Sequence, residues 1–350
     1  MAPVRRELLA WFDRHRRDLP WRRSRDPYRI WLSEIMLQQT RVEVVIPYYE
    51  RFLARFPTVE ALAAAPLDDV LALWSGLGYY RRARQLHRAA QEVAARGGFP
   101  QSLAELLALP GIGAYTAAAV GSIAFGLAEP VLDGNVERVL SRVLALAGDP
   151  KARPVRERLL AAARDLLDSD RPGDSNQAMM ELGATLCTPR NPRCLLCPLE
   201  SGCAAARQGI QESFPTPRPK RSGEKHRIAV AVVEEGEGVL LLRRPDDSPV
   251  LPGTWELPWV EEPEGAAPEA IARALGERWG GSWTLGPRLA RVRHGITFRD
   301  FEVGVHRAGL RLERAGMLQE GPQAGWFDRE QRARLPLSSL VAKVLQQVGL

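Results

Sequence analysis

Apolar residues recur three and four positions apart through about the first 200 residues of this 350-residue chain. That spacing predicts amphipathic α-helices, each with one side turned towards a core. Asp26 before Pro27 is typical of an N-cap followed by the first helical residue, and it predicts a helix through about Val45. Two or three further helices are predicted within 58–98, separated by Pro66 and by residues 76–80. Others are predicted at 102–108, from about 115, at 135–145 and at 154–167.

The helical pattern ends before a proline-rich basic segment, residues 213–225, which cannot sustain a helix or a central strand. Beyond this segment apolar and polar residues alternate, which is typical of strands. Strands are predicted at 226–233, 238–244 and 291–306, and helices at 268–279 and 338–348. The sequence therefore predicts a multidomain protein: an all-α domain over 1–212, a linker over 213–225 and an α+β domain over 226–350.

The chain carries a net charge of +6, and many of its arginines lie near the N-terminus. Such a charge suits a polyanion, although composition alone favours nucleic acid over a merely solvated surface only slightly. The sequence shows no signal-peptide pattern and no apolar run long enough to span a bilayer. We therefore expect a soluble protein of the cytoplasm with no membrane partner.

A turn with two glycines interrupts the helical pattern after residues 102–108. Pro110 cannot continue a helix, and Gly111 and Gly113 permit positive φ angles. The next helix begins near Tyr115 and presents free backbone N–H groups at its positive end, where an anion such as a DNA phosphate can bind. A helical corner packed only for structure is the alternative, and it is the better explanation of a lone Gly-x-Gly.

All four cysteines of the chain lie in one short segment, as Cys187-x6-Cys194-x2-Cys197-x5-Cys203. Such clustering argues against a disulfide framework, because no cysteine remains to join other parts of the chain. Four thiolates in so short a loop predict a metal site. The spacing alone leaves structural zinc and an iron–sulfur cluster both open.

Glu34 follows Trp31 by three residues and precedes Leu37 by three, so it shares their side of the predicted helix. Partial burial there raises the pKa of a carboxyl group and keeps it protonated near neutrality. Judged by position alone, a surface glutamate at the edge of the apolar side is the better explanation. In the same way, Tyr79 and Tyr80 beside glycines form either a tip with a stacking group or ordinary core aromatics.

Taken together, these motifs resemble the MutY family of adenine DNA glycosylases, within the endonuclease III superfamily. The run LPGIGAYTA at 109–117 resembles the superfamily's helix-hairpin-helix, and Asp133 follows the second helix as the catalytic aspartate does there. The runs WLSEIMLQQT at 31–40 and GLGYY at 76–80 and the four cysteines occur in the family's order. The strand-rich half matches its Nudix-like domain. The resemblance implies a six-helix barrel and a [4Fe–4S] module around a cleft, joined to a lesion-reading domain.

The resemblance also implies roles for single residues. Glu34 matches the general acid that protonates adenine at N7, and Asp133, with Asn135 close by in the sequence, matches the carboxylate that stabilises the positively charged sugar. Tyr115 stands where strand-cutting relatives carry a lysine, and a phenol cannot form a Schiff base, so base removal without lyase activity is implied. Contacts to adenine or DNA are implied for Trp21, Arg22, Leu37, Gln39, Thr40, Tyr79, Gly111, Gly113 and Gln177.

Two departures from family patterns concern the α+β domain. Nudix hydrolases hold magnesium with Arg-Glu-x-x-Glu-Glu-x-Gly, whereas residues 273–280 here keep one of the three glutamates, so we expect no divalent metal on this helix. MutY proteins commonly read 8-oxoguanine with Phe-Ser-His, and the aligned residues here are Phe298, Arg299 and Asp300. We expect Phe298 to insert beside the lesion and Arg299 to contact it, with His294 as the alternative reader.

The function implied is that of a monomeric, monofunctional glycosylase that removes adenine opposite 8-oxoguanine, or less efficiently guanine, from duplex DNA. One alternative is a thymine glycosylase for T:G mismatches, because some of those relatives also carry tyrosine at the lysine position. They normally lack the strand-rich domain. The other alternative is a non-catalytic iron–sulfur protein that binds DNA or senses redox state, against which the presence of both Glu34 and Asp133 argues.

Overall fold

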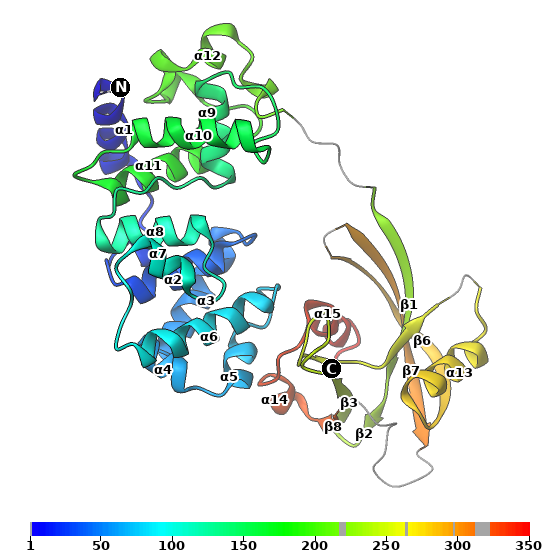
Figure 1. The fold of residues 1–350 in the computed structure, drawn as a ribbon. Coiled ribbons are helices and arrows are strands. Elements are labelled where there is room, and N and C mark those ends of the chain that lie inside the picture. The colour runs from blue at the N-terminus through cyan, green and yellow to red at the C-terminus, as the bar shows by residue number, and fades with distance from the viewer. Residues whose placement is uncertain (1, 217–221, 263–264, 297, 312–322) are drawn as a thin grey trace. The chain divides into compact units, whose positions relative to one another are not determined.

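The computed structural model describes residues 2–216, 222–262, 265–296, 298–311 and 323–350. The chain forms two compact units (Figure 1). The first contains Met1–Ala64 and Arg88–Pro219, and the second contains Ala65–His87 and Lys220–Leu350. Among the helices of the described part, none combines the length and apolarity needed to cross a membrane. The predicted fold class, an all-α part followed by an α+β domain, is confirmed.

The first unit is built from helices and short 3-10 turns. Its helices are α1 (Ala2–His15), α2 (Pro27–Leu37), α3 (Val42–Arg55), α4 (Val59–Ala64), most of α6 (Arg81–Ala95), whose first turns belong to the second unit, α7 (Leu103–Ala108), α8 (Ala114–Phe125), α9 (Gly134–Val143), α10 (Arg153–Leu166), α11 (Pro172–Thr185) and α12 (Ala204–Gln208). The 3-10 turns are η1 (Pro20–Arg22), η2 (Cys194–Leu196), η3 (Glu200–Gly202) and η4 (Gln211–Ser213). Helix α8 packs on α2 and α7, and α11 packs on α1, α8 and α9.

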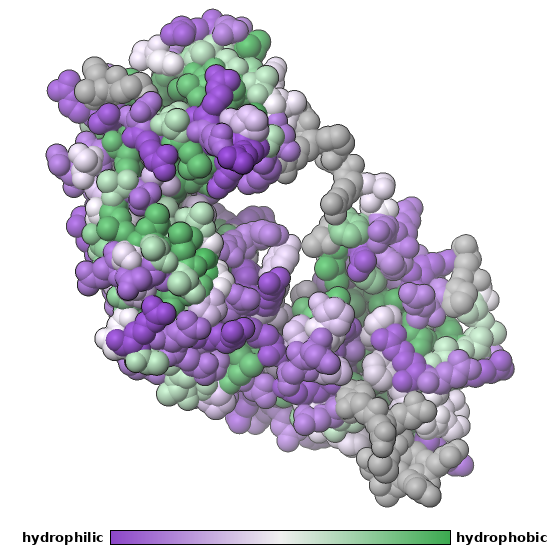
Figure 2. Space-filling view, in the orientation of Figure 1, coloured by the Kyte–Doolittle hydropathy of each residue, from purple (hydrophilic) through white to green (hydrophobic). Residues whose placement is uncertain are grey.

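Part of the core of the first unit lies where α1 and α8 to α11 meet. It contains Phe12, Ala119, Leu140, Leu159 and Leu182, one from each helix and all without exposed surface. Burying each large side chain of this kind contributes about 1.5–3 kcal/mol. Hydrophilic side chains cover much of the face that Figure 2 shows, with smaller apolar areas between them. The apolar core of the first unit thus holds α8, α9 and α11 together, and these helices carry residues of the site described below.

The helix predicted from Asp26 through Val45 is in fact two helices. Asp26 caps the first as predicted, because its side chain accepts hydrogen bonds from the backbone N–H groups of Tyr28 and Arg29. The helix ends at Leu37, and Gln39 adopts a left-handed conformation with a φ of 58°. The prediction was wrong because the left-handed residue is neither glycine nor asparagine, so the usual stop signal is missing.

The turn between α7 and α8 lies where it was predicted, but its two glycines differ in backbone conformation. Ser102 caps α7, and its side chain accepts a hydrogen bond from the backbone N–H of Glu105. Gly111 has a φ of 72°, as predicted, whereas Gly113 has a φ of −92° and is the N-cap of α8. A Cβ atom at Gly113 would meet nothing within 4 Å. The prediction of positive φ is therefore wrong for Gly113, which instead leaves open space before the N–H groups of α8.

The second unit combines a short helical segment with two four-stranded sheets. Its helices are α5 (Leu67–Leu73), α13 (Pro268–Trp279), α14 (Arg329–Arg332) and α15 (Ser339–Gln347). Its strands are β1 (Glu224–Val232), β2 (Glu234–Glu235), β3 (Gly238–Arg243), β4 (Trp255–Glu256), β5 (Trp259–Glu261), β6 (Ser282–Ile296), β7 (Arg299–Arg311) and β8 (Ala324–Phe327). One sheet has the order β5-β1-β7-β6, with β1 and β7 parallel. The other has the order β2-β3-β4, and β8 also pairs with β3.

The strand predicted at 291–306 is also two elements. Strands β6 and β7 form an antiparallel hairpin in which Ile296 pairs with Arg299. Apolar and polar residues keep alternating across the turn, so the pattern reads as one strand. The helix predicted at 268–279 is confirmed at both ends, and the short elements β4, β5, β8 and α14 were not predicted. Elements of two to four residues are too short to show a period.

An arginine lies where a Nudix hydrolase carries a metal-binding glutamate. The guanidinium carbon of Arg278 on α13 lies 3.8 Å from the ring centre of Trp259 and 4.7 Å from that of Trp279. The indole N–H of Trp259 donates to Glu256 Oε2 at 3.0 Å. The fixed cation therefore stacks on aromatic rings at this end of α13.

Candidate active site

A cavity of about 830 Å³ lies in the first unit, between the end of α2, the turn before α8, the start of α9 and the side of α11. Its size is suitable for a ligand as large as a nucleobase with its sugar. Twelve of the site residues predicted from the sequence line this cavity: Trp21, Arg22, Glu34, Leu37, Gln39, Thr40, Gly111, Gly113, Tyr115, Asp133, Asn135 and Gln177. Segments separated by more than 150 residues thus meet at one site.

Glu34 is nearly buried, with 6% of its surface exposed. The hydroxyl of Tyr115 donates a hydrogen bond to Glu34 Oε2 at 2.5 Å. Burial raises the pKa of Glu34 to about 7, and the negative charge of Asp133 acts in the same direction. The hydrogen bond from Tyr115 and the charge of Arg22 oppose this rise. A carboxyl with such a pKa is partly protonated at neutral pH, which suits a general acid.

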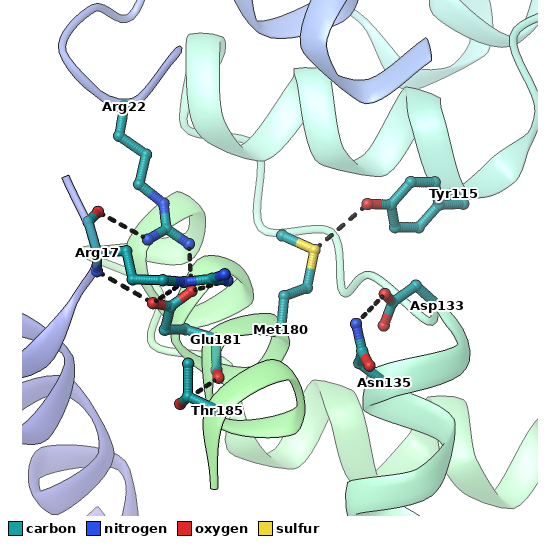
Figure 3. Close-up of polar contacts among 8 residues, drawn as sticks. All are labelled: Arg17, Arg22, Tyr115, Asp133, Asn135, Met180, Glu181 and Thr185. Atoms are coloured by element: carbon teal, nitrogen blue, oxygen red, sulfur yellow. Dashed lines mark hydrogen bonds and ion pairs between the residues drawn. The ribbon is translucent and has the colours of Figure 1, made fainter. Parts of the chain in front are cut away.

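Tyr115 joins α8 to the acid on α2. Its hydroxyl also lies 3.3 Å from the sulfur of Met180 on α11, as Figure 3 shows. Burial raises the pKa of the Tyr115 phenol well above its ordinary value, and the nearby carboxyl of Glu34 raises it further. The phenol therefore keeps its proton and donates it in a hydrogen bond to Glu34.

Asp133 is the N-cap of α9. Its Oδ1 accepts a hydrogen bond from the backbone N–H of Val136 at 2.7 Å, and its Oδ2 accepts one from Asn135 Nδ2 at 3.2 Å (Figure 3). Burial raises the pKa of Asp133 above its ordinary value, while these hydrogen bonds and Arg138 oppose the rise. Capping and catalysis are compatible, because both use the ionised carboxylate.

Arg138 fixes the orientation of Asn135 and was not singled out from the sequence. Its Nη2 donates to Asn135 Oδ1 at 2.8 Å and to the backbone carbonyl of Gly183 at 2.7 Å. A Cβ atom on Gly183 would lie 2.7 Å from the Cβ of Asn135, so α11 and α9 approach closely here. Because the side-chain carbonyl oxygen of Asn135 accepts this hydrogen bond from Arg138, the side-chain N–H of Asn135 points to Asp133.

A buried carboxylate on α11 holds two arginines at the cavity wall (Figure 3). Arg17 donates to Glu181 twice through its side chain, both at 2.8 Å, and Arg22 Nη2 donates once at 2.9 Å. Burial would raise the pKa of Glu181, but the hydrogen bonds from Arg17 and Arg22 outweigh it and bring the pKa to about 2. The site therefore holds two carboxyls whose pKa burial raises, Glu34 and Asp133, and one, Glu181, whose pKa two arginines lower.

Sequence reasoning missed Glu181 and Arg17. The available signal was an acidic residue within the run 178–183, whose other members are apolar or small. Such a residue is buried only when it is paired. The sequence could not indicate that its partner arginines lie about 160 positions earlier.

Four of the predicted contact residues lie in the second unit. Tyr79 follows α5 with a φ of 49° and has 45% of its surface exposed. Phe298 is at the turn of the β6–β7 hairpin, and the guanidinium of Arg299 lies 5.4 Å from its ring centre and 3.1 Å from Glu224. His294 lies on β6, where its Nε2 is 3.4 Å from the hydroxyl of Ser339. Burial lowers the pKa of His294, and Lys343 lowers it further.

The four cysteines line one small pocket in the first unit. Among the described residues, no three His, Cys, Asp or Glu side chains converge on a point where a single metal ion would bind. A four-iron cluster is larger than one ion and takes one thiolate at each iron, so its ligands lie farther apart. Arg142 Nη1 lies 3.3 Å from Cys187 Sγ, so a hydrogen-bond donor faces one of the four sulfurs. This donor set and its surroundings fit a cluster.

Two family models match separate parts of the chain. The model described as "HhH-GPD superfamily base excision DNA repair protein" matches residues 32–164, and a NUDIX domain model matches residues 229–347. An adenine DNA glycosylase of Homo sapiens is 37% identical over 407 residues, which cover 99% of this chain and 74% of that protein. One of Mus musculus is also 37% identical and covers 99% of this chain and 78% of its own length.

Two solved structures resemble the helical part of the chain. A thermostable thymine-DNA glycosylase aligns with a TM-score of 0.53 and 30% identity, over 58% of this chain and 95% of its own. A non-covalent endonuclease III–DNA complex aligns with a TM-score of 0.50 and 23% identity, over 59% of this chain and 95% of that one. The second likeness supports the fold alone.

Proposed function

This chain belongs to the adenine DNA glycosylases of base-excision repair, and we propose that it removes adenine paired with 8-oxoguanine, or less efficiently with guanine, from duplex DNA. The observation that carries the proposal is the pair of carboxyls in one cavity, Glu34 with a pKa of about 7 and Asp133 at the N-terminus of α9. The presence of the Nudix-like domain supports the preference for the oxidised base.

The two carboxyls divide the chemistry between them. Adenine must leave the base stack to enter the cavity, which costs a few kcal/mol. Glu34, protonated and hydrogen-bonded by Tyr115, donates its proton to adenine N7 so that a neutral base leaves. Asp133, ionised, stabilises the positive charge that develops on the sugar as the glycosidic bond breaks. It also helps direct water to C1′, and the water releases its proton to a carboxylate of the site as the new C–O bond forms. Burial raises the pKa of both carboxyls, and the hydrogen bonds that Asp133 accepts from Val136 and Asn135 favour its ionised form.

Strand cleavage should require alkali or heat after base removal. Tyr115 hydrogen-bonds to Glu34 and offers a phenol, which cannot form an imine with the sugar aldehyde. We expect labelled duplexes with A opposite 8-oxoguanine to break only after alkali treatment. Adenine should be removed from them faster than from duplexes with A opposite G. Duplexes with T opposite G should stay intact. A protein–DNA adduct trapped by borohydride would contradict the monofunctional proposal, and cleavage of the T:G duplex would favour the thymine glycosylase.

The cofactor we propose is a [4Fe–4S] cluster held by Cys187, Cys194, Cys197 and Cys203. Its role would be structural, bracing the loop that carries Arg190 and Arg193. Arg193 Nη2 donates to the backbone carbonyl of Thr185 at 2.6 Å, so this loop is tied to the end of α11. All steps of base removal proposed above use side chains of the cavity and none uses the cluster.

We propose that Arg299 reads the oxidised base in place of the family's histidine. Its side chain is 47% exposed and its ion pair with Glu224 is exposed as well, so exchanging this partner for DNA costs little. Arg299→Ala should reduce the preference for A opposite 8-oxoguanine over A opposite G by about five-fold or more in single-turnover rates. If His294→Ala removes the preference and Arg299→Ala leaves it unchanged, His294 is the reader instead.

A further inference from the structure

The turn that carries Tyr79 has an unusual backbone. Gly76, Gly78 and Tyr79 all have positive φ angles, of 97°, 69° and 49°. Glycine adopts this conformation freely, whereas for a tyrosine it is unfavourable and persists only where neighbouring groups hold it. The turn connects α5 to α6 and belongs to the same compact unit as the α+β domain.

Contacts within the segment hold one side of the turn. Trp74 Nε1 donates to the backbone carbonyl of Gly78 at 3.1 Å, and Arg82 Nη2 donates to those of Leu77 and Gly78 at 3.0 and 3.2 Å. The Arg82 guanidinium also lies 5.4 Å from the ring centre of Trp74 and 5.5 Å from that of Tyr79. The Arg82 guanidinium thus contacts the rings of both Trp74 and Tyr79 and helps to hold the Tyr79 side chain in place.

Contacts from the α+β domain hold the other side. The hydroxyls of Ser75 and Tyr80, one on each side of the turn, both donate to the backbone carbonyl of Leu337. Tyr80 is 2% exposed and Leu337 is 8% exposed, so these hydrogen bonds are shielded from water. Leu337 forms a bridge with Trp255 of β4 and precedes α15, which places it in the framework of the domain.

Further polar contacts extend this attachment along the segment. Arg84 Nη2 donates to the backbone carbonyl of Pro252 at 2.8 Å and to Asp246 at 3.2 Å. Arg243 of β3 lies 3.6 Å from the carboxylate of Asp68 on α5. The turn is therefore attached to the α+β domain both before and after its left-handed residues.

We propose that Ser75 and Tyr80 are positioning residues. Through their hydrogen bonds to Leu337, the α+β domain determines where the side chain of Tyr79 contacts DNA. This inference rests on the proposed function, in which the α+β domain reads the oxidised base, and on the contact with DNA that the family resemblance implies for Tyr79. The shared carbonyl of Leu337 makes the two contacts to DNA interdependent. Lesion binding by the domain then favours the position of Tyr79 that supports adenine removal.

The test compares single-turnover rates of the full chain and its variants on A opposite 8-oxoguanine and A opposite G. Tyr80→Phe and Ser75→Ala should each lower the ratio of the two rates by about five-fold, the effect of one lost hydrogen bond. Tyr28→Phe is the matched control, because its hydroxyl, on a residue 3% exposed in the first unit, donates to the carbonyl of Phe56 at 2.9 Å. That variant should lose stability to a similar degree and keep the rate ratio.

A second comparison distinguishes a positioning role of Tyr80 from a general loss of stability in the second unit. If Tyr80 acts through Tyr79, Tyr80→Phe should change the rate ratio little in a chain that already carries Tyr79→Ala. A normal ratio in both Tyr80→Phe and Ser75→Ala, or equal effects with and without Tyr79, would overturn the inference. Absence of any lesion preference in the unsubstituted chain would instead refute the proposed function on which it rests.

Discussion

Replacing Glu34 with glutamine is expected to reduce adenine release by about 10²–10⁴-fold, the usual contribution of a general acid. The amide fills the same volume and can still accept the hydrogen bond from Tyr115, but it has no acid proton to donate to N7. Duplex binding should stay within a few-fold of normal. Single-turnover rates and a binding titration on one duplex measure both quantities.

The pH profile gives this prediction a signature that a folding defect would not produce. The acid must be protonated, so the rate of the unsubstituted chain should fall as pH rises through about 7, the pKa of Glu34. The residual rate of Glu34→Gln should lack this fall. Glu256→Gln is the matched control, since Glu256 is also buried and its pKa is also raised, but it lies on β4 in the other unit. A Glu34→Gln variant with ordinary activity would remove Glu34 from the mechanism.

The same pKa has a consequence for stability. The pKa of Glu34 is about 7 in the folded chain and 4.5 for an ordinary glutamate, so the folded state binds this proton more tightly. The contribution of this bound proton to the free energy of unfolding is fully present below pH 4.5 and is lost as the pH rises through 7. The loss is on the order of 3 kcal/mol. Glu34→Gln should therefore be more stable than the unsubstituted chain at pH 8. Poor folding would then not explain its inactivity.

Local signals were sufficient for much of the fold and the cavity. Asp26, Ser102 and Asp133 cap helices because short polar side chains accept from the first free N–H groups, which depends only on neighbouring residues. The cavity residues could be nominated because a family resemblance supplied what spacing alone could not. Gln39 shows the limit of local signals, since its left-handed backbone is imposed by its surroundings.

Contacts between distant parts of the chain account for most of what was missed. Arg17 pairs with Glu181 across 164 positions, and Tyr80 donates to Leu337 across 257. Neither contact leaves a periodic pattern, because each involves one polar group that is buried only once the fold has formed. The attachment of Ala65–His87 to the α+β unit belongs to the same class.

Replacing Asp133 with asparagine is expected to reduce adenine release by about 10²–10³-fold, the loss typical when a charge-stabilising group is removed from a transition state. Asparagine is as good an N-cap as aspartate, so the start of α9 and the hydrogen bond from Val136 should persist. The variant thus removes charge with little change of shape. Melting temperature and single-turnover rate together distinguish these effects.

The pH profile of the unsubstituted chain should show the other carboxyl as well. Asp133 acts when ionised and Glu34 when protonated, so the rate should rise with pH through the pKa of Asp133, which burial lifts above its ordinary value, and fall again near 7. Asp133→Asn should flatten the acidic limb and keep the alkaline fall in its residual rate, moved to lower pH because the charge of Asp133 no longer raises the pKa of Glu34. An acidic limb that survives the substitution would mean that another group holds the positive sugar, and Asp133 would then serve α9 only as its cap.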